Sequence, residues 1–392
     1  GMASISLTLS ASMVGFSFFV PINIAAGLCF FYLLTTVQRG LWGLVGWGDK
    51  EDAMGAYSQY TEPDIIHEAM GGMIVLVVGT LWIGRHHLRD VLRKAFYDAD
   101  DVDDSDEILS YRATAWLWLG CLIYIAGWLL ATGLPPLAMV VFLVGSFVIF
   151  LAIARVIAQG GVGFTSSTML PQPFTVYTLG TDLIGWKGLA STGLSYSWAA
   201  EMRTTVMASS ANGLKLISGH SLRSHRVFWA IVLAIVTGLV VASWTTLHLN
   251  YTYGGINLRQ FGVPTIAWRF VEDKLLNPIG WEHIKPRLLF TAIGATAMAG
   301  LVWLQHHVLW WPLHFIGLPV ADSWVMGWAW FSVLIGWLLK AMILRFGGVN
   351  AIATYRPIFV GFIAGQLMGG AVWMVIDILL GETGNRVYIG VP

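Results

Sequence analysis

Several charged side chains of this sequence lie within long apolar runs, where they could bind a solute or carry a proton. A charge that faces lipid costs several kcal/mol, roughly 2.5–3.5 on insertion scales, so such groups face a cavity or a polar partner. Glu201 and Arg203 lie two positions apart in a stretch of small residues and therefore point to different sides of a helix. With Asp182 nearby in the sequence, they predict a polar cavity for a solute that is charged at both ends. The alternative is that Glu201 and Arg203 pair with other helices and have only a structural role.

Glu68 and Asp377 are the candidates for proton coupling. Glu68 lies about one turn into an apolar run, beside His67, and a carboxylate in a low-dielectric setting holds a proton more readily. The alternative for Glu68 is a position at the membrane interface, stabilised by the positive end of the helix dipole. Asp377 could equally be interfacial. The predicted site residues are Asp182, Glu201, Arg203, Lys215 and Gln159 for substrate binding, and Glu68 and Asp377 for proton coupling.

The sequence does not indicate a metal site, a cofactor site or an enzyme active site. His306 and His307 are neighbours that do not share a helix face, so with His314 they predict polar or interfacial contacts and no bound metal. Cys29 and Cys121 lie within apolar runs and are expected to be small core residues without a disulfide. No nucleotide-binding loop and no nucleophile with a partner base occurs, and the net charge is zero. We therefore expect neither an enzyme nor a nucleic-acid-binding protein.

The composition is that of an integral membrane protein. Of the 392 residues, 56% are hydrophobic and 11% are charged, whereas about a quarter of the residues of soluble domains are charged. The 20 tryptophans suit the membrane interface, and the 44 glycines allow helices to approach closely. We predict an all-α integral membrane protein, a polytopic helical bundle in which residues 1–392 form one transmembrane domain with about 8–10 spans. We expect this protein to be embedded in a lipid bilayer.

Eight apolar stretches have the length of about 20 residues that a span needs. They are Phe16–Val37, Ile65–Ile83, Ala113–Leu130, Leu137–Ala158, Val227–Leu249, Leu288–Val308, Trp324–Leu344 and Ile358–Leu380. In the last stretch Gly361, Gly365 and Gly369 share one helix face, which favours tight packing. The basic residues after Ile83 place the loop 88–112 in the cytoplasm.

Residues 159–219 interrupt this pattern because Gly, Ser, Thr and two prolines crowd the segment. Irregular backbone at membrane depth is tolerated only where it is buried in protein or lines a cavity, so we predict broken or re-entrant helices here. In transporters such segments often form the substrate site. A shorter break at Trp311–Pro319 predicts either a second half-helix or an ordinary kink or interfacial loop.

Three stretches resemble the oligopeptide transporter family and its bacterial relatives. The segment Gly15–Pro21 followed by Phe30–Leu34 is similar to that family's turn before an aromatic helix. His67–Gly72, running on to Arg85 and His87, resembles its next helix and the basic extension. The third stretch is Gly213–Lys215 with Gly219 and Ser221–Arg223, but Gly213 stands where the family usually has aspartate and Leu222 where it usually has proline. Any role of that acidic group is therefore not inherited.

The resemblance implies secondary transport of small peptides or metal chelates, usually driven by protons, in the cell (inner) membrane. These transporters are longer, and the chain matches only their C-terminal half. A homo-oligomer, or a separate chain that supplies the missing N-terminal half, would complete such a transporter. The alternative function is a non-transporting membrane subunit that scaffolds a larger complex.

Overall fold

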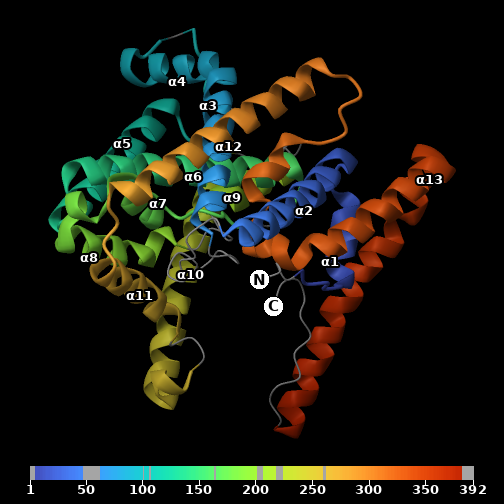
Figure 1. The fold of residues 1–392 in the computed structure, drawn as a ribbon. Helices are drawn as coiled ribbons and strands as arrows, with labels where there is room; N and C mark the ends of the chain where they lie inside the picture. The colour runs from blue at the N-terminus through green and yellow to red at the C-terminus, as the bar shows by residue number, and fades with distance from the viewer. Residues whose placement is uncertain are drawn as a thin grey trace.

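The chain folds into a bundle of helices (Figure 1). The computed structural model describes residues 5–46, 62–99, 101–105, 107–162, 165–200, 206–217, 224–258 and 262–381, and every regular element in these ranges is a helix. The elements are α1 Ala11–Phe19, α2 Ile22–Val45, α3 Pro63–Ile83, α4 Arg85–Tyr97, α5 Tyr111–Ala131, α6 Pro136–Gly160, α7 Pro171–Leu179, α8 Thr181–Ala199, α9 Val206–Ile217, α10 Ser224–Tyr253, η2 Gly255–Asn257, α11 Gly262–Leu276, α12 Trp281–His307, η4 Phe315–Val320 and α13 Trp324–Leu380.

Seven helices of the described ranges are long and apolar enough to cross a membrane: α2, α3, α5, α6, α10, α12 and α13. The 57-residue α13 bends at Gly348, whose φ of 67° is not helical, and its two sections contain the last two predicted spans. The predicted class, an all-α polytopic membrane protein with broken helices, is confirmed.

The first predicted span is wrong as a continuous helix. Phe16–Val37 is divided between α1 and α2 by Val20 and Pro21, both of which have extended ψ values. Pro21 has no N–H to continue the hydrogen bonding of α1. The short α1 packs instead against α13, where the rings of Phe18 and Phe359 stack with centroids 3.7 Å apart.

Helices α3 and α12 touch backbone to backbone at two glycines. A Cβ atom added to Gly294 would lie 1.8 Å from the carbonyl oxygen of Glu68, and one added to Gly71 would lie 1.9 Å from that of Thr291. Small residues allow membrane helices this approach. The contact fixes the position of Glu68 and its neighbour His67 along the axis of α12.

The segment between α6 and α9 consists of short helices. Pro171 starts α7 at a position where its missing N–H costs no hydrogen bond. Gly180, with φ 82°, separates α7 from α8, and Gly185, with φ 66°, interrupts α8. Both φ values are readily adopted only by glycine. The break at Trp311–Pro319 forms the buried 3₁₀ helix η4 and no α-helical half-helix.

Two sequence expectations about packing are corrected. Gly361, Gly365 and Gly369 have no neighbouring atom within 4 Å of an added Cβ, so no described helix packs on that face. Cys121 is exposed and is not a core residue, whereas Cys29 is buried as expected; both are free thiols. The glycine face and the exposed helix α10 both belong to parts that project from the bundle (Figure 1).

Candidate functional site

A group of charges joins the last third of α2, the start of α3 and Asp322, which lies between η4 and α13. Arg39 Nε donates to Glu62 Oε2 at 3.0 Å, and Arg39 Nη2 donates to Asp322 Oδ1. The Arg39 side chain is 7% exposed and that of Asp322 1%. Ser323 caps α13 by accepting a hydrogen bond from the Met326 amide, which fixes the backbone beside Asp322. One guanidinium thus faces the buried carboxylate of Asp322 and the largely buried carboxylate of Glu62.

Glu68 of α3 is hydrogen-bonded to α2 at the residue before Arg39. Gln38 Nε2 donates to Glu68 Oε2 at 2.8 Å. Gln38 and Arg39 are consecutive residues of α2. Gln38 therefore contacts Glu68 while its neighbour Arg39 contacts Glu62 and Asp322. We name Arg39, Glu62, Asp322, Gln38 and Glu68 the carboxylate cluster.

A second group surrounds the ring of Tyr177 on α7. The Arg287 guanidinium of α12 lies 4.0 Å from the ring centroid, and the Lys274 ammonium of α11 lies 5.2 Å from it. The His67 ring meets the same ring edge-on at 6.1 Å. These four residues form the cation–aromatic cluster, and all four are almost completely buried.

Hydrogen bonds fix the members of the cation–aromatic cluster. His67 Nδ1 lies 3.1 Å from Thr291 Oγ1, while its Nε2 has no hydrogen-bond partner in the described part of the chain. Lys274 also forms an ion pair with Asp273 at 2.7 Å. Burial acts to raise the pKa of Asp273, but hydrogen bonds from Lys274 and Asn277 together hold this pKa below its ordinary value.

Helix α3 connects the two clusters through consecutive residues. His67 belongs to the cation–aromatic cluster and Glu68 to the carboxylate cluster, about 100° apart around the helix axis. A displacement or rotation of α3 would therefore change both clusters together. The arrangement can exchange protons at one group of side chains and bind an anionic group at the other.

Of the predicted substrate-binding residues, the three that the structure describes lie on three different helices. Asp182 lies exposed at the start of α8, and Lys215 lies exposed on α9. Gln159 is exposed on α6, where it accepts from Arg155 Nε at 3.2 Å. Glu201 and Arg203 lie outside the described residues.

The two predicted proton-coupling residues have different surroundings. Glu68 is half-buried within the carboxylate cluster, where it accepts a hydrogen bond from Gln38. Asp377 is half-buried near the end of α13, on the section that projects from the bundle.

Sequence reasoning missed most members of both clusters. Arg39, Glu62 and Asp322 lie at the ends of apolar segments, where charges are ordinarily solvated. Lys274 lies in the more polar helix α11, and Arg287 lies in the polar first turns of α12. The indication in the sequence that Arg39, Glu62 and Asp322 belong to a site was their position at the ends of apolar segments, next to a break in the helices. The described residues contain no group of three His, Cys, Asp or Glu side chains that could hold a metal ion, and His314 Nδ1 accepts from the Ile316 amide at 3.2 Å.

The fold and the buried charges define the class of this protein, a polytopic all-α membrane protein. A family of unknown function, DUF6785, has a model that matches residues 1–389, so the chain belongs to that family. No curated protein and no solved structure was found to match it.

Proposed function

We propose that this protein is a proton-coupled secondary transporter of small peptides or metal chelates in the cell (inner) membrane. The observation that supports this most is the carboxylate cluster, in which Arg39 faces both Glu62 and Asp322 in the protein interior. Buried ionisable groups in a membrane protein are costly and commonly mark ion or proton pathways.

The carboxylate cluster is the proposed proton-coupling site. Burial and the mutual repulsion of the two carboxylates favour uptake of a proton, whereas the Arg39 guanidinium between them opposes it. Protonation of Glu62 weakens its attraction to Arg39 and so loosens α2 from α3. Protonation of Asp322 likewise loosens α2 from the segment between η4 and α13. Glu68, held by Gln38, transmits that loosening to α3.

The cation–aromatic cluster is the proposed site for the solute. A peptide or a chelate carries carboxylates, and Arg287 and Lys274 offer buried cations beside the apolar ring of Tyr177. A solute carboxylate would compete with Asp273 for Lys274. The resemblance of the Gly15–Pro21 and His67–Gly72 stretches to oligopeptide transporters is further support for this substrate class.

Uptake into proteoliposomes tests the proposal. Wild-type protein should accumulate a labelled dipeptide or an iron chelate when the outside is acidic, and should not do so without a pH gradient. Asp322→Asn and Glu68→Gln should lose accumulation but keep facilitated exchange of the solute at equal concentrations. Glu282→Gln removes an exposed carboxylate in the first turn of α12 and is the matched control.

Melting curves in detergent accompany the uptake assay. If Asp322→Asn lowers only the melting temperature and leaves coupled uptake intact, the cluster is structural and the coupling assignment fails. Absence of uptake of every peptide and chelate by the wild-type protein would contradict transport itself.

The exposure of α10 favours a scaffold subunit as the second candidate function. No residue in the most apolar window of α10 is buried, and the Gly361, Gly365 and Gly369 face of α13 is open. A partner in the membrane could cover both. Stable co-purification of a second membrane chain, together with absent uptake, would favour this function over transport.

A further inference from the structure

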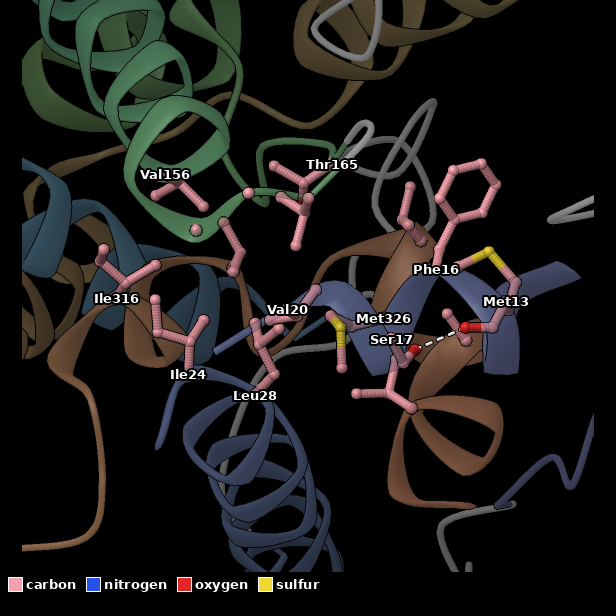
Figure 2. A pocket seen from close by; sticks show the side chains of 17 residues that line it. Met13, Phe16, Ser17, Val20, Ile24, Leu28, Val156, Thr165, Ile316 and Met326 are labelled. Carbon is pink, nitrogen blue, oxygen red and sulfur yellow. Dashed lines mark hydrogen bonds between the residues drawn. The ribbon is translucent and has the colours of Figure 1, made fainter. Parts of the chain in front are cut away.

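An apolar cavity of about 330 Å³ lies between α1, α2, the end of α6, η4 and α13. Figure 2 shows Val156 and Ile316 on one side of it and Met13 and Phe16 on the other. Ser17 and Thr165 are the polar side chains of the lining, and the Ser17 hydroxyl donates to the Met13 carbonyl at 2.5 Å. The cavity therefore suits a hydrocarbon group and not a charged solute.

The cavity wall reaches the outer surface of the bundle at α1. Phe16, which lines the cavity, is 47% exposed, and its neighbour Phe19 on the same short helix is 42% exposed. The surface of a membrane-spanning bundle at apolar helices faces lipid chains. A group that enters beside α1 therefore comes from the hydrocarbon of the bilayer.

A cation lies one residue from the cavity lining along α6. Val156 and Gly160 of α6 line the cavity, and Arg155 and Gln159 are their neighbours along the helix. Gln159 links Arg155 to His314, with 3.5 Å to His314 Nε2, and His314 in turn accepts from the amide of the lining residue Ile316. This chain of contacts connects the guanidinium, through Gln159 and His314, to the part of the cavity lining formed by η4.

Arg155 has only neutral partners within the described ranges. Its Nε donates to Gln159, and its Nη1 donates to the Leu76 carbonyl and to Thr80 Oγ1. No described carboxylate forms an ion pair with it, and its Nη2 makes no hydrogen bond there. Leu76 and Thr80 lie near the end of α3, which continues into the basic helix α4. Basic side chains at the end of a membrane bundle attract anionic headgroups.

We propose that the cavity and Arg155 together bind one anionic phospholipid, with an acyl chain in the cavity and the phosphate at the guanidinium. A cavity of about 330 Å³ is many times larger than the roughly 10–15 Å³ that one water molecule needs, so it has room for a section of an acyl chain. When an acyl chain moves from the bilayer into this cavity, it exchanges one apolar environment for another, so this step hardly distinguishes one lipid from another. The charge of the headgroup therefore determines which lipid is retained. The site does not depend on the transport function proposed above.

The experiment measures lipid retention by the full chain. The protein is placed in nanodiscs of equal parts dioleoyl phosphatidylglycerol and dioleoyl phosphatidylcholine, extracted in mild detergent, and examined by native mass spectrometry. Wild-type protein should retain one phosphatidylglycerol in at least tenfold preference to phosphatidylcholine.

Four variants separate the headgroup contact from the acyl-chain contact. Arg155→Gln should lose the tenfold preference, and Arg155→Lys, which keeps the charge, should retain it. Ala329→Phe places a ring in the cavity and should reduce retention of both lipids at least tenfold. Arg89→Gln removes an exposed charge on α4 and is the matched control, with retention as in the wild type.

Two results would overturn the assignment. One is an unchanged phosphatidylglycerol preference in Arg155→Gln, or an unchanged amount of retained lipid in Ala329→Phe. Arg155→Lys shows whether a loss of preference in Arg155→Gln reflects the charge or the folding of the protein. The other is displacement of the lipid by inorganic phosphate or by a labelled dipeptide at equal concentration, which would assign the site to a soluble anion or to the solute.

Discussion

Substitution of Gly294 tests whether the close contact of α3 and α12 positions the two clusters. An alanine Cβ at this position would lie 1.8 Å from the Glu68 carbonyl oxygen, and real Cβ contacts essentially never fall under 3.0 Å. The two helices must therefore move apart by about 1.2 Å, the difference between these distances. Both contacting atoms belong to helix backbones, so no side chain can rotate away to relieve the overlap.

Gly300 in the same helix provides a matched control. No atom lies within 4 Å of a Cβ added there. Both substitutions gain helix propensity of about 1 kcal/mol, and that gain cancels when the variants are compared. Overpacking costs about 1–3 kcal/mol. We therefore expect Gly294→Ala to have a free energy of unfolding about 1–3 kcal/mol below that of Gly300→Ala.

Unfolding in mixed micelles of dodecyl maltoside with increasing SDS, followed by far-UV circular dichroism, measures this difference. Uptake by the same two variants shows whether the displacement of α3 also separates Glu68 from Gln38. Equal unfolding free energies for Gly294→Ala and Gly300→Ala would refute the reasoning, because the helices would then be free to separate at no cost.

Three further outcomes are expected. Arg39→Met strands two buried carboxylates and should lower the free energy of unfolding by about 3–5 kcal/mol, and a loss under 1 kcal/mol in the same SDS titration would show that the pair is solvated. Asp103→Cys in the loop 88–112 should react with an impermeant maleimide only in inverted vesicles; labelling of intact cells would reverse the orientation. Asp273→Asn should lower the melting temperature near neutral pH, because a carboxylate with a depressed pKa stabilises the fold above its unfolded pKa. The difference from wild type should shrink as the pH falls below about 4, and a constant difference across this range would exclude the carboxylate charge as its cause.

The amino-acid sequence by itself determined the class of fold. In a bilayer every backbone N–H and C=O must be satisfied within the protein, so an apolar run of about 20 residues has hardly any alternative to a helix. The runs therefore predicted α3, α5, α6, α10 and α12 closely. Pro21 carried the information that divides the first span, because proline cannot continue a helix, yet the length of the apolar run outweighed it in the prediction.

The same reasoning found Glu68, because a carboxylate within an apolar run is costly and local sequence is enough to reveal it. It placed the substrate site in residues 159–219, where small residues and prolines predicted broken helices. The described helices there are short. One of them, α7, contributes Tyr177 to the cation–aromatic cluster, through an aromatic ring that no charge-based argument would select.

Only the tertiary structure decided which charges meet. Arg39 and Asp322 are 283 positions apart, and neither lies deep within an apolar run. Their pairing depends on which face of α2 the segment after η4 packs against, and that choice depends on backbone contacts such as the one between Gly27 and Gly317. In the same way Gly71 and Gly294 bring α3 against α12, so that His67 and Arg287 can meet at Tyr177. Helix formation in a membrane follows from hydrogen bonds within one segment, whereas a buried charge cluster follows from the close packing of several segments, which no single segment specifies.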